Sequence, residues 1–247
     1  MKYGILADIH SNLEAFQAVL AFLKKNRVEV MVIAGDVLGY GASPLECLQL
    51  LAGEQSVACV RGNHEEALLS GEFSRMRPEA VTSLIWTRQQ LNRFWIDYLA
   101  SFPFIICGAN FALCHGAADR PLSGYLTSRD RAKRAFAARL HRICFCGHTH
   151  FPCVYRQKED SPEVELIPAD FNGCLKVKLE PGWSYLINVG SVGQPRDGLP
   201  VACAGVYDTG QEVFFLERIE YRVEVARERI LTAGLPAFLG ERLCRGV

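Results

Sequence analysis

The sequence predicts an α/β protein with a single domain, in which two sheets pack face to face and helices cover them. Over residues 2–60 short apolar strands alternate with helices, which is typical of parallel strands. From residue 104 onward short strands follow one another more closely, which favours a more antiparallel arrangement. No linker, low-complexity tract or internal repeat divides the 247 residues, so we expect one domain over 1–247.

Apolar periodicity and turn residues place the elements in order. In the first half we expect strands at 2–7, 29–34 and 57–60, and helices at 11–26, 44–52 and, with a break near 71–78, 64–100. In the second half we expect strands at 104–107, 110–114, 143–146, 153–156, 163–167, 174–178, 184–188, 202–207 and 212–218, and helices at 127–140, 221–232 and 236–243. Ser11 and Glu14 fit the capping-box pattern of a helix start, and Thr127 is the expected cap of a later helix.

Composition excludes several classes of protein. Hydrophobic residues make up 49% and charged residues 22%, which is typical of globular chains. Lys and Arg balance Asp and Glu at 27 each, so no net charge favours nucleic acid or an anionic membrane as a partner. The chain shows neither a long apolar run nor a signal peptide. The 10 cysteines include no C-x-x-C, and we expect Cys59, Cys107, Cys114, Cys144 and Cys203 to be buried thiols of a cytoplasmic protein.

Five predicted strands each end in a short polar motif. The motifs are Asp8-Ile9-His10, Gly35-Asp36, Gly62-Asn63-His64-Glu65, His115-Gly116 and Gly147-His148-Thr149-His150. In open α/β sheets, ligands bind beyond the carboxyl ends of the strands. Five of the six histidines lie in these motifs, and only His141 falls elsewhere, at a helix end. One histidine alone would suggest a structural role, but five beside Asp8, Asp36 and Asn63 predict a metal site.

The donor types indicate which metal ions the site prefers. Carboxylate, amide oxygen and imidazole together suit Mn²⁺, Fe²⁺, Zn²⁺, Co²⁺ or Ni²⁺ better than Ca²⁺ or Mg²⁺, and we favour manganese. The ligands are too many for one closed structural zinc, which takes four. A pair of divalent ions about 3.5–4 Å apart would use them, binding a phosphoryl oxygen and holding a hydroxide.

The order and spacing of the five motifs, over roughly residues 4–207, resemble the calcineurin-like metallophosphoesterase superfamily. The stretches Gly39-Tyr40-Gly41 and 188–198 are similar to those of its small prokaryotic phosphodiesterases and diadenosine-tetraphosphatase-like proteins. The resemblance implies a four-layer α/β/β/α sandwich of two mixed sheets flanked by helices. It also implies a dinuclear phosphoesterase in which metal-activated hydroxide attacks a phosphodiester or phosphomonoester.

The resemblance also implies a role for each motif residue. Asp8, His10 and His150 would hold one metal; Asn63, His115 and His148 would hold the other; Asp36 would bridge the two; and His64 would act as the general acid. The chain departs from the phosphoprotein phosphatases of the superfamily, whose Gly-Asp pair is followed by a further Asp-Arg. Gly39 and Tyr40 stand at those positions here, which disfavours a phosphoprotein phosphatase.

Three further residues are candidate substrate contacts. Asn12 lies near a helix start, where capping is an alternative role. Tyr40, like Tyr125, lies in a loop near the predicted site and is suited to stacking on a base, although loop tyrosines more often only pack. Arg196 lies in a Gly/Pro-rich loop after a strand, where it would contact phosphate or else pair with Asp197 or another carboxylate.

Two functions of different classes remain open at this point. The first is a metal-dependent phosphoesterase acting on a small phosphate ester or nucleotide, without a membrane or nucleic-acid partner. The second is a non-catalytic scaffold of the same fold that binds other proteins. Because the seven candidate ligands and His64 are all present, the sequence favours the enzyme.

Overall fold

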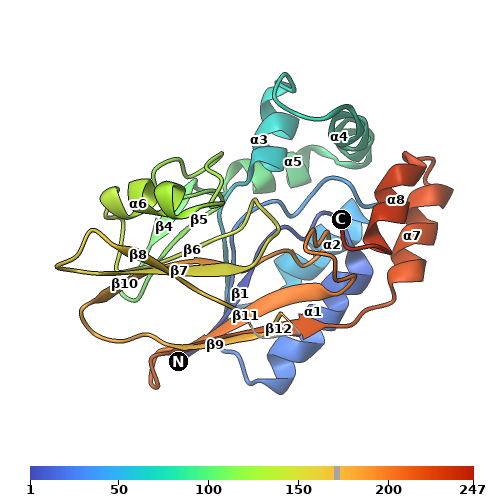
Figure 1. Cartoon of the computed structure of the whole chain (residues 1–247). Helices are drawn as coiled ribbons and strands as arrows, with labels where there is room; N and C mark the ends of the chain where they lie inside the picture. The colour runs from blue at the N-terminus through green and yellow to red at the C-terminus, as the bar shows by residue number, and fades with distance from the viewer. Residues whose placement is uncertain (170–172) are drawn as a thin grey trace.

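The computed structural model of the chain describes residues 1–169 and 173–247. Two six-stranded mixed sheets pack face to face and helices lie outside them, which confirms the predicted fold class (Figure 1). Among the described residues the strands are β1 (Lys2–Leu6), β2 (Val30–Ile33), β3 (Val57–Cys59), β4 (Ile105–Cys107), β5 (Ala112–Cys114), β6 (Ile143–Cys146), β7 (Cys153–Lys158), β8 (Val164–Ile167), β9 (Leu175–Lys178), β10 (Trp183–Asn188), β11 (Ala202–Asp208) and β12 (Val213–Ile219). The helices are α1 (Leu13–Lys25), α2 (Pro44–Gly53), α3 (Asn63–Ser70), α4 (Pro78–Gln90), α5 (Arg93–Ala100), α6 (Arg129–Ala137), α7 (Val223–Thr232) and α8 (Ala237–Leu243).

The first sheet joins the two halves of the chain. Its order is β3-β2-β1-β11-β12-β9, with β1, β2 and β3 parallel and β11 antiparallel to β1. The second sheet has the order β4-β5-β6-β10-β7-β8, and β6 is parallel to both β5 and β10. The parallel strands expected in the first half are confirmed, and most strand pairs of the second half are antiparallel, as expected. The expectation did not include that β11, β12 and β9 join the sheet of the first half. Nearly every residue of β11 is buried, so this strand is suited to the middle of a sheet and not to a separate edge.

Three apolar layers hold the sandwich together. Phe145, Tyr207 and Phe214 fill the space between the sheets. Phe16 of α1 packs with residues of the first sheet, and Ala132 of α6 packs on the outer face of the second. Fully burying one large apolar side chain contributes about 1.5–3 kcal/mol, so these layers fix how the two sheets meet.

Local sequence details shift several predicted boundaries. Asn12, and not Ser11, caps α1, because its Oδ1 accepts a hydrogen bond from the Ala15 N–H at 3.1 Å. Ser11 has a φ of 53°, outside the extended conformation of a cap. Ser128, and not Thr127, caps α6 through the Arg131 N–H. A second break at Leu91 and Asn92, which we did not predict, separates α4 from α5.

The cysteines follow the expectation with one exception. Cys59, Cys114, Cys144 and Cys203 are buried, but Cys107 at the end of β4 is exposed, because β4 is the edge strand of its sheet. Burial raises the pKa of the Cys144 thiol to about 12 and that of Cys146 well above its usual value. These two cysteines are therefore neutral thiols within the fold. No helix in residues 1–169 or 173–247 is long and apolar enough to cross a membrane.

The last two helices, α7 and α8, pack against each other, and α7 packs against α1 (Figure 1). Their apolar side chains, including Ile230 and Leu239, form a small core with Tyr40. Arg229 Nε of α7 donates to Glu14 Oε1 of α1 at 2.7 Å, and this carboxylate is buried. Glu14, predicted as part of a capping box, instead joins α1 to the C-terminal helices.

Candidate metal centre

The ends of five strands or strand–helix turns bring all eight predicted site residues together. The first sheet supplies Asp8 and His10 after β1, Asp36 after β2, and Asn63 and His64 at the start of α3. The second sheet supplies His115 after β5 and His148 and His150 after β6. The side chains of seven of these residues are buried, and Asn63 is partly exposed. The site therefore lies where the edges of the two sheets meet.

The site loops adopt an uncommon backbone conformation. Asp8, Asp36 and His148 have φ values of 55°, 53° and 69°, in the left-handed region that non-glycine residues seldom adopt. Such residues cost of order 1–3 kcal/mol each and tend to cluster at functional sites. The glycines of the motifs permit close approach, since a Cβ at Gly62 would lie 2.1 Å from Asp36 Oδ1 and one at Gly147 would lie 2.5 Å from Asp8 Oδ2.

The first group of donors consists of Asp8, His10 and His150. Nδ1 of His10 donates to the Leu38 carbonyl at 3.0 Å, and Nδ1 of His150 donates to the Gln194 carbonyl at 2.5 Å. Each neutral ring therefore carries a lone pair on Nε2, and the two Nε2 atoms are 3.2 Å apart. Asp8 Oδ1, which has no hydrogen-bond partner among the described residues, lies 3.4 Å from His150 Nε2.

The second group is built in the same way around His115. Its Nδ1 donates to the Ala34 carbonyl at 2.7 Å, which leaves a lone pair on Nε2. That nitrogen lies 2.9 Å from Asn63 Oδ1 and 2.9 Å from His148 Nδ1. Asp36 Oδ2 is 3.4 Å from the same nitrogen and 3.8 Å from His10 Nε2. Asp36 therefore lies between the two groups.

Burial shifts the pKa values of the histidines and aspartates in both donor groups toward their neutral forms. Burial lowers the pKa of His10 well below its usual value and lowers that of His115 to about 4. The histidines are therefore neutral. Burial raises the pKa of Asp8, and that of Asp36, above the usual value for an aspartate. Buried carboxylates and converging lone pairs need a cation to be stable as bases, so the residues fit divalent metal ions.

The comparisons with known proteins agree with this site. A sequence model described as the Calcineurin-like phosphoesterase superfamily domain matches residues 1–212. The chain belongs to that superfamily. It is 32% identical to the uncharacterized protein MJ0912 of Methanocaldococcus jannaschii over 98% of this chain and 97% of that protein. The crystal structure of a metallophosphoesterase from Sphaerobacter thermophilus, also 32% identical, covers 100% of this chain and 99% of its own with a TM-score of 0.84. The hypothetical protein PH1004 of Pyrococcus horikoshii shares the fold, at 16% identity and a TM-score of 0.80 over 100% of this chain and 98% of that one.

Glu65 is a residue of the candidate site whose role the sequence analysis missed. Its carboxylate is fully buried and accepts three backbone N–H groups, from Gly62 and Asp36 at 2.9 Å and from Leu38 at 3.0 Å. Burial, and then the charge of Asp36, raises the pKa of Glu65 to about 7. Glu65 thus ties the start of α3 to the loop that carries Asp36. Its place at the third position of a helix, after Gly62, was the available signal, because that position commonly reaches back to the cap.

The surroundings of His64 explain why position 39 holds a glycine and not the aspartate of the phosphoprotein phosphatases. His64 Nε2 lies 3.9 Å from Asp36 Oδ2, and its backbone N–H donates to Asp36 Oδ1 at 2.9 Å. Gly39 has a φ of 92°, and a Cβ there would lie 2.1 Å from His64 Nδ1. An aspartate at position 39 would therefore displace the His64 ring. The Tyr40 ring lies 4.7 Å from the ring centres of both His10 and His64.

Of the candidate substrate contacts, Tyr40 lies against the rings of His10 and His64, whereas Asn12 and Arg196 are held by other partners. Asn12 caps α1, and its Nδ2 donates to the Gly193 carbonyl at 2.8 Å, so both ends of its amide are bonded within the protein. Arg196 does not pair with Asp197, which accepts a hydrogen bond from Arg218 instead. Arg196 Nη2 donates to Gln194 Oε1 at 2.8 Å and lies 3.5 Å from the Tyr40 hydroxyl.

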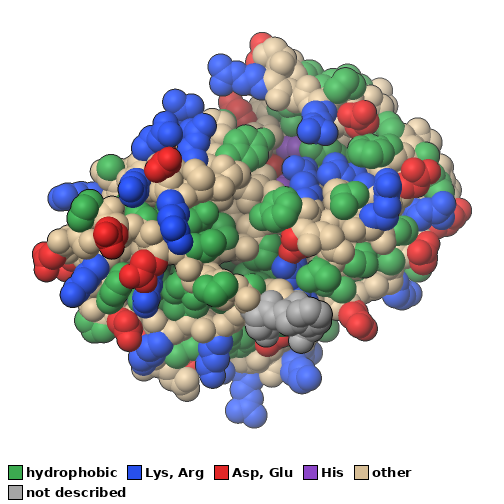
Figure 2. All heavy atoms as spheres, viewed as in Figure 1, with side chains coloured by type: hydrophobic (Ala, Val, Ile, Leu, Met, Phe, Trp, Pro, Cys, Tyr) green, Lys and Arg blue, Asp and Glu red, His purple; other side chains and the backbone are tan. Residues whose placement is uncertain are grey.

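Tyr125 lies beside the second group of donors, against His148. Its ring is 4.1 Å from that of His148, and half of the side chain is exposed. The ring therefore packs on a predicted metal ligand and leaves an aromatic surface open to solvent. Figure 2 shows a histidine within a hollow of the molecular surface, with hydrophobic and with Lys or Arg side chains close by.

Proposed function

We propose that this protein is a dinuclear, metal-dependent phosphoesterase that hydrolyses small phosphate esters or nucleotides. One ion would be held by Asp8, His10 and His150 and the other by Asn63, His115 and His148, with Asp36 shared. The observation that carries this assignment is the position of Asp36 Oδ2, 3.8 Å from a donor of the first group and 3.4 Å from a donor of the second. Bound there, two divalent ions would polarise a phosphoryl oxygen and activate water.

The protein's own residues hold these donors in the metal-binding state. The carbonyls of Leu38, Gln194 and Ala34 fix the protons of His10, His150 and His115 on Nδ1. Each of these rings then presents Nε2 to the centre without a change of tautomer. Ligand orientation of this kind typically contributes 10–100-fold in metal affinity.

His64 is the residue we assign as general acid. Hydrolysis joins the water oxygen to phosphorus and breaks the bond to the ester oxygen, which then needs a proton. Burial, and then the charges of His115 and Arg196, lowers the pKa of His64. The negative charge of a bound phosphate acts in the opposite direction, so proton uptake by His64 is coupled to substrate binding.

The test is an assay of the metal-reconstituted protein against a panel of phosphomonoesters and phosphodiesters, with metal content measured on the same sample. We expect close to two divalent ions per chain, activity that a strong chelator removes, and restoration by manganese. A protein that binds the ions but hydrolyses no member of the panel would favour the scaffold function and contradict the proposal.

A further inference from the structure

The imidazole of His64 lacks the backbone anchor that other histidines of the site have. Nδ1 of His10, of His115 and of His150 each donates to a main-chain carbonyl. Nδ1 of His64 is buried and has no hydrogen-bond partner among the described residues. Its Nε2 lies 3.9 Å from Asp36 Oδ2, which is beyond hydrogen-bond distance. Packing therefore sets the orientation of this ring.

Two aromatic rings and a glycine pack against the His64 imidazole. The Tyr40 ring centre lies 4.7 Å away at an interplanar angle of 56°, and the His10 ring centre lies 4.6 Å away at 64°. Gly39 lies against Nδ1, since a Cβ there would come within 2.1 Å of that atom. Aromatic pairs at such distances contribute about 0.5–1.5 kcal/mol beyond the area they bury. Because His10 is a predicted metal ligand, Tyr40 is the neighbour whose role is still unassigned.

The backbone of Tyr40 is strained. Its φ is 60°, in the left-handed region where a bulky residue is an outlier. Hydrogen bonds on both sides hold this conformation: the Tyr40 N–H donates to Ser83 Oγ at 2.9 Å, and the Gly41 N–H donates to the His10 carbonyl at 3.0 Å. Such strain costs about 1–3 kcal/mol and persists only where the surroundings fix it. The fold therefore keeps this ring beside His64 at a cost.

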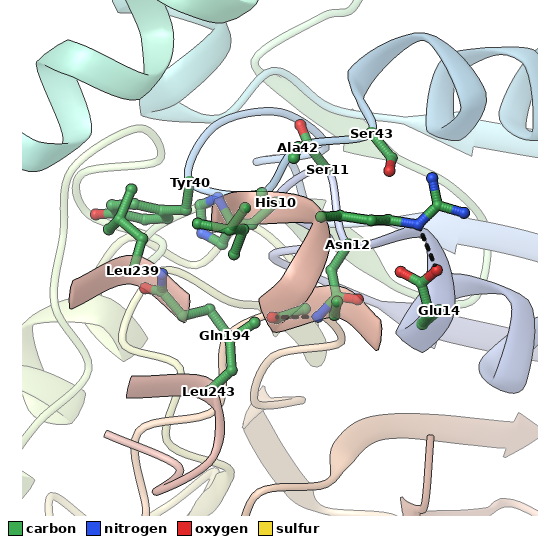
Figure 3. A pocket seen from close by; sticks show the side chains of 15 residues that line it. His10, Ser11, Asn12, Glu14, Tyr40, Ala42, Ser43, Gln194, Leu239 and Leu243 are labelled. Atoms are coloured by element: carbon green, nitrogen blue, oxygen red, sulfur yellow. Dashed lines mark hydrogen bonds and ion pairs between the residues drawn. The ribbon is translucent and has the colours of Figure 1, made fainter. Parts of the chain in front are cut away.

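Other segments hold the rest of the Tyr40 side chain. Arg196 Nη2 lies 3.5 Å from its hydroxyl, and the guanidinium carbon lies 5.9 Å from the ring centre. Leu239 of α8 lines the same pocket as Tyr40 and His10, whose rings lie side by side in Figure 3. Tyr40 thus packs between the apolar core of the C-terminal helices and the two histidines.

Stacking on a base, the other role considered for Tyr40, fits these contacts less well. A ring that stacks on a ligand needs an open face, as Tyr125 has with half of its side chain exposed. Tyr40 is instead in ring contact with His10 and His64 and packs on the C-terminal core. Its contacts are those of a residue that supports its neighbours.

We propose that Tyr40 is a positioning residue for His64, whose imidazole its ring holds with Nε2 toward the oxygen of the leaving group. This inference rests on the proposed function, which makes His64 the general acid. In that step the proton passes from His64 Nε2 to the oxygen released from phosphorus, and Tyr40 gives up no proton. The ring of Tyr40 has the positioning role, because its hydroxyl lies against Arg196 and not against His64.

The first test measures the order of the His64 ring in the metal-free protein, by NMR relaxation of its Cε1–H group. The signal is assigned by its absence from His64→Ala. We expect an ordered ring in the wild type and in Tyr40→Phe, which keeps the aromatic ring. In Tyr40→Leu the order parameter should fall from about 0.85 to below about 0.6, the values typical of rigid and of flexible groups. An unchanged order parameter in Tyr40→Leu would overturn the inference.

The second test compares an alkyl with an aryl phosphate on the metal-reconstituted protein. Tyr40→Leu should lower kcat for the alkyl ester by about tenfold or more and for the aryl ester much less, because the misplaced group is an acid. KM and metal content should stay near those of the wild type. In a His64→Ala background the same substitution should have little further effect, and Tyr40→Phe should behave as the wild type does.

Tyr221→Leu is the matched control, because Tyr221 packs on the same C-terminal core and makes no ring contact with a site histidine in the described part of the chain. It should lower the melting temperature as Tyr40→Leu does, but leave the His64 order parameter and the preference between esters unchanged. If Tyr40→Leu does not fold, Tyr40→Met carries both tests with the same expectations.

Two kinetic results would also overturn the inference. Equal losses of kcat for both esters would give Tyr40 a general structural role, and a KM raised only for substrates with a base would make it a stacking contact. A wild type that hydrolyses no ester contradicts the proposed function instead. The NMR measurement needs neither metal nor turnover, so it still decides whether Tyr40 orders the His64 ring.

Discussion

The proposed metal-binding side and the proposed substrate-facing side of this site differ in how their residues are held. The predicted metal ligands lie after strands or at the start of α3, on short turns with left-handed residues, and backbone carbonyls fix the proton of each of three imidazoles. Tyr40 and Arg196 come from two loops that are distant in the sequence, and they meet through a ring contact and a few side-chain hydrogen bonds. The comparison teaches that local turns position the predicted metal ligands, whereas contacts between distant segments position the candidate substrate contacts.

The largest effect should come from Asp36→Ala, which tests the metal-binding side. Because Asp36 lies between both donor groups, its loss should reduce the content of both ions and bring phosphoesterase activity to background. Metal analysis and an activity assay of one preparation measure this. Full metal content together with full activity would show that the two groups do not form one bridged centre.

His64→Ala should lower turnover by about 10²–10⁴-fold while the metal content stays nearly intact, because a general acid is lost but no ligand. The loss should be smaller for aryl phosphates, whose leaving groups need less protonation. His141→Ala is the control, since His141 lies after α6 and its Nδ1 accepts a hydrogen bond from the Ile143 N–H. A parallel loss of metal and activity in His64→Ala would make His64 a ligand instead.

Arg196→Met tests the substrate-facing side. A guanidinium that contacts phosphate contributes about 1.5–3 kcal/mol, so kcat/KM should fall roughly 10–100-fold with little change in melting temperature. The control is Arg218→Met. Arg218 of β12 pairs with Asp197, which lies in the same loop as Arg196, so its loss should lower the melting temperature and leave kcat/KM nearly unchanged. The reverse pattern for Arg196→Met would give that residue a structural role.

Glu65→Gln tests whether the proposed metal site depends on the hydrogen bonds that Glu65 accepts from the surrounding backbone. An amide cannot accept from all three backbone N–H groups that Glu65 now binds, and one buried unsatisfied group costs about 1–3 kcal/mol. We expect a lower melting temperature and metal affinity reduced by about tenfold or more. Glu66→Gln is the matched control, because Glu66 is the neighbouring glutamate, is partly exposed and pairs with Arg61 instead of with the loop of Asp36. If the two variants behave alike in calorimetry, Glu65 does not organise the site.

The smallest effect on catalysis should come from Asn12→Ala. Losing the cap of α1 should lower the free energy of unfolding by about 1 kcal/mol, and losing the hydrogen bond to the Gly193 carbonyl should lower it further. KM should stay unchanged. Ser128→Ala removes the cap of α6, away from the metal centre, and gives the scale of a cap alone. A raised KM specific to Asn12→Ala would instead make Asn12 a substrate contact.

The same comparison explains what the sequence could predict. The fold class and the meeting of the eight site residues followed from strand ends, because a residue that directly follows a strand has its place set by a few bonds. The pairing of β11 with β1 did not follow, since it joins segments about two hundred residues apart and no local pattern encodes it. The hydrogen bonds that Glu65 accepts from Asp36 and Leu38 were missed for the same reason, as only the packed chain brings these partners close.

The pairing of β11 with β1 has a consequence for how the protein is made. Ile5 pairs with Gly205, and the Gly193 N–H and Ser191 Oγ both donate to the Asp8 carbonyl. The turn that carries Asp8 is therefore completed only after most of the chain has left the ribosome. Contacts of such high sequence separation slow folding, and the nascent first half exposes an unpaired edge of β1 meanwhile. A metal ion bound at the proposed centre would accordingly load late, after translation of the C-terminal strands.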